Sequence, residues 1–187
     1  MSLIETPEAL ATARGRLAAA PLALDTEFMR ERTWYPQLAL VQVADAEGTV
    51  LLVDAQITGL RGELATLVAA ADALMHSASE DLVAFRHALG VLPRTLFDTQ
   101  IAAAFAGLGP GLGYQALVQQ LLGLALDKGE TRSDWLKRPL SPRQLEYAAE
   151  DVRHLHALAA ALRERLAARG HAARAEADMA RLLEAAR

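Results

Sequence analysis

The 187-residue sequence contains no cysteine. This absence excludes disulfide bonds and metal sites built from thiolates, and it fits a protein of the cytoplasm, where thiols stay reduced. The sequence also lacks a long apolar run, because charged residues interrupt every stretch before the roughly 18 residues needed to span a bilayer. The N-terminus has no basic stretch followed by an apolar core, so we expect neither a signal peptide nor a membrane-spanning helix.

An excess of positive charge is also missing. The formal net charge is −4 and the sequence pI is about 5.7. A charge of this sign provides no general attraction to phosphate groups, which argues against a nucleic acid as partner. Divalent cations held by a cluster of carboxylates would reverse the charge locally, since bound ions are often the largest charges in a site. The net charge therefore weakens a nucleic-acid interpretation without excluding it.

The order of apolar segments predicts an α/β fold with one mixed sheet flanked by helices. Three closely spaced apolar runs predict an antiparallel meander over residues 21–24, 38–43 and 49–54, and a further short strand is expected over 73–76. Helical patterns cover residues 7–20, 62–71, 79–89, 98–106, 114–122, 141–169 and a last segment from about 173. The expected N-caps of four of these helices are Thr6, Ser79, Asp98 and Ser141.

Carboxylates stand at positions that bring them together in such a fold. Asp25 and Glu27 lie two residues apart at the end of an apolar strand, so their side chains leave the same face. Tyr147 and Asp151 lie four residues apart in the long predicted helix and stack one turn apart. Asp81 falls in the first turn of another helix, where a carboxylate also stabilises the helix dipole. Each residue has a structural explanation by itself, but together they can form an oxygen-ligand site for Mg²⁺ or Mn²⁺.

Other polar residues fit structural roles better. His76 is expected to be a strand-end residue, because the metals that carboxylates favour prefer oxygen ligands. His154 and His156 are two residues apart on a helix, so they do not share a face and form a poor metal pair. Asp98 is expected to cap a helix and not to take part in catalysis.

Five segments of the chain resemble the signature blocks of the ribonuclease D family. They are Leu24-Asp25-Thr26-Glu27-Phe28, Tyr35-Pro36-Gln37-Leu38, the run from His76 to Leu82, Phe97-Asp98-Thr99, and Tyr147-Ala148-Ala149-Glu150-Asp151. The last block has the Tyr-x-x-x-Asp pattern of the tyrosine subgroup of DEDD exonucleases. The resemblance implies a ribonuclease H-like fold and a single exonuclease domain over 1–187. Its motif-bearing core is expected at about 21–166, and a helical tail at about 171–187.

The resemblance also implies an activity and roles for individual residues. It implies a 3′–5′ exoribonuclease that uses two divalent ions and releases nucleoside 5′-monophosphates from a single-stranded RNA 3′ end, for example in trimming a tRNA precursor or another structured RNA. Asp25 is implied to bridge both ions, Glu27 and Asp151 to complete the site that activates water, and Asp81 to hold the second ion, partly through water. Tyr147 is implied to position the attacking water.

Contacts with the substrate are implied less directly. The resemblance places Phe28 or Met29 near the terminal nucleotide, while a core position is an equally good interpretation of Phe28. A basic segment over 128–143 can guide the RNA backbone or simply form a solvated loop. Its basic residues are Lys128, Arg132, Lys137, Arg138 and Arg143. A DNA exonuclease of the same superfamily, an inactive nucleic-acid-binding domain and a purely structural α/β domain remain open as alternatives.

Overall fold

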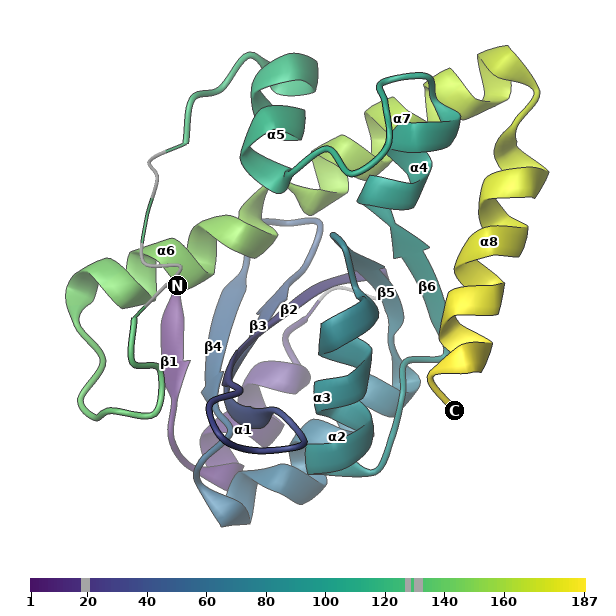
Figure 1. The fold of residues 1–187 in the computed structure, drawn as a ribbon. Helices are drawn as coiled ribbons and strands as arrows, with labels where there is room; N and C mark the ends of the chain where they lie inside the picture. The colour runs from purple at the N-terminus through teal and green to yellow at the C-terminus, as the bar shows by residue number, and fades with distance from the viewer. Residues whose placement is uncertain (18–20, 127–128, 130–132) are drawn as a thin grey trace.

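A mixed sheet lies at the centre of the molecule (Figure 1), and the computed structural model describes residues 1–17, 21–126, 129 and 133–187. The sheet has six strands in the order β1-β4-β3-β2-β5-β6. They are β1 (Ser2–Ile4), β2 (Leu22–Met29), β3 (Gln37–Ala44), β4 (Val50–Asp54), β5 (Asp72–Met75) and β6 (Thr95–Asp98). Strands β2, β3 and β4 are antiparallel, while the β1–β4, β2–β5 and β5–β6 pairs are parallel. The predicted mixed sheet is therefore confirmed.

Helices cover both faces of this sheet (Figure 1). They are α1 (Pro7–Arg14), α2 (Arg61–Ala70), α3 (Ser79–Leu89), α4 (Thr99–Phe105), α5 (Tyr114–Leu122), α6 (Pro142–Arg153), α7 (Leu155–Arg169) and α8 (Ala172–Ala185), with a 3₁₀ turn at Thr58–Leu60. Side chains alternate between the two faces: Leu40 of β3 packs with α4 to α7, and Val41 packs with α1 to α3. Helix α8 lies along β6 and contributes to both cores. No helix in the described part of the chain is long and apolar enough to cross a membrane.

Several predicted boundaries are wrong. The first helix ends at Arg14 and not at Ala20, while residues 18–20 lie outside the described residues. Strand β2 continues past Leu24 to Met29, and the short strands β1 and β6 were not predicted at all. The single helix expected over 141–169 is interrupted at His154, so that α6 and α7 are separate helices.

Three of the four predicted N-caps are confirmed. Thr6 accepts a hydrogen bond from the Ala9 N–H, and Ser141 forms a capping box with Gln144. Asp98 accepts from two N–H groups of α4 and also from the backbone N–H groups of residues 77 and 78, before α3. Ser79 is not a cap, because it is already the first residue of α3. Asp98 therefore ties the start of α3 to the start of α4.

Candidate active site

Strand β2 carries the first two carboxylates. Asp25 pairs with Gln42 of β3 and Glu27 pairs with Leu40, and the register shifts between Glu27 and Phe28. Asp25 and Glu27 share the face that α6 covers, since their neighbour Ala23 belongs to the core on that side. The predicted common face of the two carboxylates is therefore confirmed.

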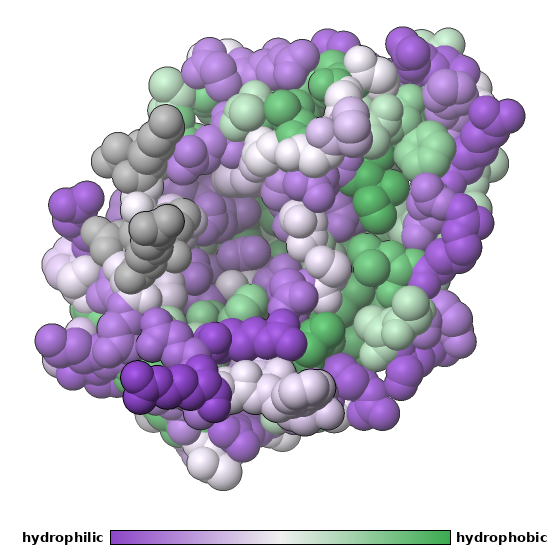
Figure 2. All heavy atoms as spheres, viewed as in Figure 1, coloured by the Kyte–Doolittle hydropathy of each residue, from purple (hydrophilic) through white to green (hydrophobic). Residues whose placement is uncertain are grey.

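Helix α6 brings the third carboxylate and the tyrosine to the same place. It packs across β2, β3 and β4 through the fully buried residues Ala148, Ala149 and Val152. Tyr147 and Asp151 lie one helical turn apart beside this apolar stripe. Figure 2 shows a hollow on this side of the molecule with mostly hydrophilic residues inside it, where Figure 1 has β2 to β4 between α6 and α3.

Asp25, Glu27 and Asp151 form a three-carboxylate cluster. One oxygen from each lies within 4.8 Å of the others, close enough to share a metal ion. Burial is the largest cause that raises the pKa of all three groups, to about 9 for Glu27 and about 7 for Asp151. The pKa of Asp25 is raised well above its usual value, first by burial and then by the charges of Asp81, Asp151 and Glu27. Such a cluster is electrostatically strained as anions, and a divalent cation would relieve that strain. The residues therefore fit a divalent metal ion.

Asp81 lies next to this cluster but is not part of it. It is buried in the first turn of α3, with 7% exposure, and accepts a hydrogen bond from the Thr26 hydroxyl. Burial raises its pKa to about 7, while the bond from Thr26 opposes the rise. Its negative charge also raises the pKa of Asp25, Glu27 and Asp151. The structure thus brings three of the four predicted metal ligands together and places the fourth close enough to act on them electrostatically.

Tyr147 has its ring fixed from two sides. Its ring centroid lies 6.1 Å from that of the buried Trp135, and Gly129 is so close to the ring that a Cβ at this position would collide with it. Burial raises the pKa of the Tyr147 hydroxyl, and the charges of Asp151, Glu27 and Asp25 raise it further. The hydroxyl therefore stays protonated beside the carboxylates and can donate a hydrogen bond there.

Gln42 is a site residue that the sequence reasoning missed. Its side chain is fully buried, and the Nε2 amide donates a hydrogen bond of 3.1 Å to Asp25 Oδ2. The bond holds one oxygen of Asp25 in place across the β2–β3 pair. The signal in the sequence is a single glutamine within the otherwise apolar run 38–43, where only a polar partner makes burial tolerable.

The structure describes two of the four residues predicted to contact the substrate. Phe28 packs against the core on the α1–α3 face, whereas Met29 packs on the face that carries Asp25 and Glu27. Lys128 and Arg132 lie outside the described residues. A pocket of about 160 Å³ adjoins the cluster, lined by Gln115, Leu126, Gly129, Arg143, Glu146, Tyr147, Glu150 and Asp151.

His76, His154 and His156 do not belong to the three-carboxylate cluster found among the described residues. His76 Nδ1 contacts the Thr99 hydroxyl, and burial lowers the pKa of this histidine. His154 contacts the Glu150 carboxylate, while His156 contacts the Pro21 carbonyl. These last two histidines therefore have partners in different segments of the chain.

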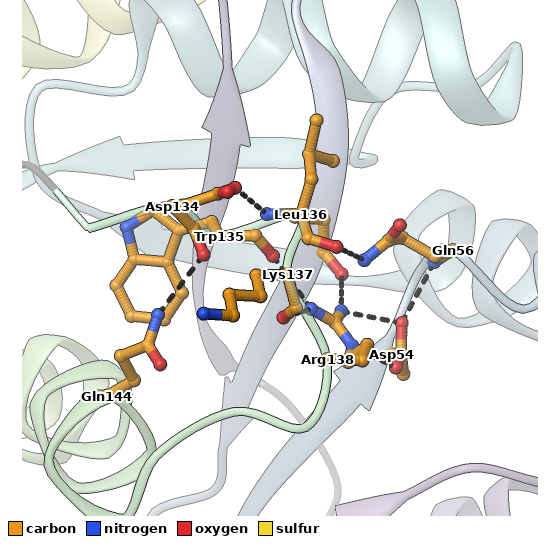
Figure 3. A network of polar contacts seen from close by, with 9 residues as sticks. Asp54, Gln56, Asp134, Trp135, Leu136, Lys137, Arg138 and Gln144 are labelled. Atoms are coloured by element: carbon orange, nitrogen blue, oxygen red, sulfur yellow. Dashed lines mark hydrogen bonds and ion pairs between the residues drawn. The ribbon is translucent and has the colours of Figure 1, made fainter.

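Residues 133–140 form a loop, the 133–140 loop, whose Trp135 ring packs near the ring of Tyr147. Figure 3 shows the Arg138 guanidinium directed at Asp54, to which it donates two hydrogen bonds of 2.6 and 2.8 Å. Arg138 also donates to the Ala39 and Trp135 carbonyls. Arg138 therefore holds the loop against the sheet. Its guanidinium is committed to these bonds and is not free to guide RNA, which its place in the basic segment had suggested as one role.

A comparison with protein families gives the class of protein. A family model described as 3′-5′ exonuclease matches residues 1–167. The chain therefore belongs to the 3′-5′ exonuclease family.

Curated relatives narrow the family to the ribonuclease D type. Ribonuclease D of Xanthomonas oryzae pv. oryzae is 57% identical over 166 residues, which are 88% of this chain and 46% of that protein. Ribonuclease D of Escherichia coli K12 is 44% identical over 162 residues, or 86% of this chain and 43% of that protein. The predicted resemblance to ribonuclease D-type DEDD exonucleases is confirmed. The chain spans about half the length of these relatives.

Solved structures agree with the fold. The crystal structure of Escherichia coli RNase D, an exoribonuclease involved in structured RNA processing, superposes with a TM-score of 0.92 at 39% identity, covering 99% of this chain and 50% of that one. Brucella melitensis NrnC with bound Mg²⁺ gives a TM-score of 0.78 at 30% identity, covering 89% of this chain and 83% of that one.

Proposed function

We propose that this chain is a metal-dependent 3′–5′ exoribonuclease that releases nucleoside 5′-monophosphates from RNA. The observation that carries the proposal is the partly buried cluster of Asp25, Glu27 and Asp151, with their oxygens within 4.8 Å and the pKa of each carboxyl raised. Without a cation, burying three carboxylates together lowers the stability of the folded state, and a bound divalent ion would offset that cost. The similarity to ribonuclease D supports RNA as the substrate class.

Four carboxylates would hold the ions: Asp25, Glu27, Asp81 and Asp151. Two divalent ions, when bound, activate a water molecule and stabilise the leaving oxygen of an in-line displacement. Carboxylate ligands are compatible with Mg²⁺ and Mn²⁺, and the NrnC structure with bound Mg²⁺ favours the former. Asp25 would hold metal from the centre of the site, because the negative charges of Asp81, Asp151 and Glu27 all act on its carboxyl group.

The other residues hold these groups and the water. Gln42 fixes one oxygen of Asp25 by donating its amide hydrogen. The protonated Tyr147 hydroxyl, next to Asp151, is suited to orient the attacking water by a hydrogen bond. Met29, on the same strand face as the carboxylates, is better placed than Phe28 to contact the terminal nucleotide.

The proposal also covers the bounds of the exonuclease domain and the kind of RNA that it trims. We assign one exonuclease domain to 1–187, with the core at 21–166 and the tail at 171–187, because α8 contributes side chains to both cores. The Escherichia coli structure is described as an exoribonuclease involved in structured RNA processing, which supports 3′ trimming of tRNA precursors or similar RNAs by this chain as well.

Digestion of labelled nucleic acid tests the proposal. RNA and DNA of one sequence, each carrying a 5′ label, are incubated with the protein and Mg²⁺ or Mn²⁺, and the products are separated on a gel. We expect RNA to shorten from its 3′ end one nucleotide at a time, and a 3′-phosphate to block the reaction. An Asp25→Asn preparation purified in parallel controls for contaminating nucleases. Faster loss of DNA would favour the rival DNA exonuclease, and internal cuts in a circular RNA would contradict the 3′–5′ direction.

A further inference from the structure

The break between α6 and α7 needs a physical cause. The sequence over 141–169 has a continuous helical pattern, yet the helix is interrupted at His154, three residues after Asp151. Neither proline nor glycine lies at the break. Sharp bends in helices otherwise arise where a side chain or a water inserts into the ladder of backbone hydrogen bonds.

The Tyr114 hydroxyl occupies that place. It donates a hydrogen bond of 2.8 Å to the Glu150 carbonyl and accepts one of 3.3 Å from the His154 N–H, which also reaches the Val152 carbonyl. Residues 150 and 154 are four apart, so these two backbone groups would bond directly in an unbroken α-helix. The tyrosine oxygen therefore lies between the two partners of one helical hydrogen bond.

Tyr114 is well anchored for this role. It is the first residue of α5, which packs against α7, and its ring meets that of His76 edge-on with 5.7 Å between the centroids. The hydroxyl approaches α6 from a different element, so the position of α5 determines where the helix bends. The bend in turn affects where the side chains at the end of α6, among them Asp151, lie relative to the sheet.

We infer that Tyr114 is a positioning residue, which places the Asp151 carboxylate opposite Asp25 and Glu27 by holding open the helix turn that follows it. The inference rests on the proposed function, because it assigns this effect to the metal site. Asp151 follows Glu150 in the chain, and the Glu150 carbonyl accepts the hydrogen bond that the Tyr114 hydroxyl donates. Without the hydroxyl, the backbone groups of Glu150 and His154 can bond to each other, and the end of α6 rotates with them.

The Tyr114→Phe variant tests this inference, because it removes one oxygen and keeps the ring. Mn²⁺ is titrated into the RNA-free protein by calorimetry, and the metal dependence of RNA cleavage is measured beside it. We expect the dissociation constant for Mn²⁺ and the half-saturating concentration in the assay to rise about tenfold, as for other residues that orient metal ligands. A role limited to stability would lower the melting temperature and leave the metal affinity unchanged.

Tyr35→Phe is the matched control, since Tyr35 stacks on His87 at the surface and is 49% exposed. It should bind Mn²⁺ like the wild type. A Tyr114→Phe affinity within twofold of the wild type, or an equal change in Tyr35→Phe, would overturn the inference. If Tyr114→Phe does not fold, Tyr114→Met removes the same hydroxyl and carries the same expectation. A wild-type protein that binds Mn²⁺ but leaves RNA intact would instead refute the proposed function.

Discussion

Two arginine–aspartate pairs of similar geometry differ in burial and offer a direct test of what supports the site. Arg138 and Asp54 form a two-bond pair in which the Asp54 side chain is only 5% exposed. Arg94 and Asp72 also form two bonds, but their side chains are 61% and 32% exposed. Arg138→Ala removes a guanidinium group from the pair with the buried aspartate, and Arg94→Ala removes the same group from the exposed pair.

The buried pair should dominate the energetics. Among the described residues, Arg138→Ala leaves the buried Asp54 carboxylate with one remaining hydrogen-bond donor, the Gln56 N–H at 3.0 Å. Breaking a buried ion pair in this way costs about 3–5 kcal/mol of unfolding free energy. For a chain of this size, this corresponds to a melting temperature lower by about 6–20 °C. Arg94→Ala should change the melting temperature little, because solvent screens an exposed pair.

Thermal unfolding followed by circular dichroism measures both changes in one buffer. The 133–140 loop also carries Trp135, which packs against Tyr147, so Arg138→Ala should lower the rate of RNA cleavage even well below its melting temperature. Equal stability losses in Arg138→Ala and Arg94→Ala would show that burial of the clamp is not what stabilises the loop.

Three further predictions follow from the site. Tyr147→Phe should lower kcat by about 10²–10³ and leave metal binding nearly unchanged, whereas Asp151→Asn should need more metal for any activity. Steady-state kinetics over a series of metal concentrations separates the two effects. Turnover of Tyr147→Phe at the wild-type rate would make Tyr147 a packing residue. Excess chelator should abolish cleavage and added Mg²⁺ or Mn²⁺ restore it, so full activity in chelator would contradict a metal site. In chelator, the melting temperature should fall as pH rises from about 5 to 9. The carboxyl pKa values are raised in the folded state, to about 7 for Asp81 and Asp151 and about 9 for Glu27, so the folded state binds more protons than the unfolded state in this range. Added Mn²⁺ should reduce this loss of stability, and a melting temperature that rises with pH would refute the reasoning.

The residues themselves predicted the parts of the site that depend on local spacing. A separation of two on a strand and of four on a helix places side chains on one face whatever surrounds them, so the common face of Asp25 and Glu27 and the stacking of Tyr147 on Asp151 could be stated in advance. The order of apolar segments likewise predicted a mixed sheet, because each segment carries its own periodicity, although the short strands β1 and β6 were missed.

Tertiary structure decided what depends on contacts between distant segments. Ser79 was expected to cap α3, but Asp98, about twenty residues further on, bonds the backbone before that helix from a neighbouring strand end. The helical pattern continues through His154, yet a hydroxyl forty residues earlier in the chain interrupts it. Gln42 and Arg138 likewise find their partners on other elements, Asp25 on β2 and Asp54 on β4. Sequence periodicity describes which face of an element is apolar, but a hydrogen bond between elements exists only once the fold has brought both partners within about 3 Å of each other.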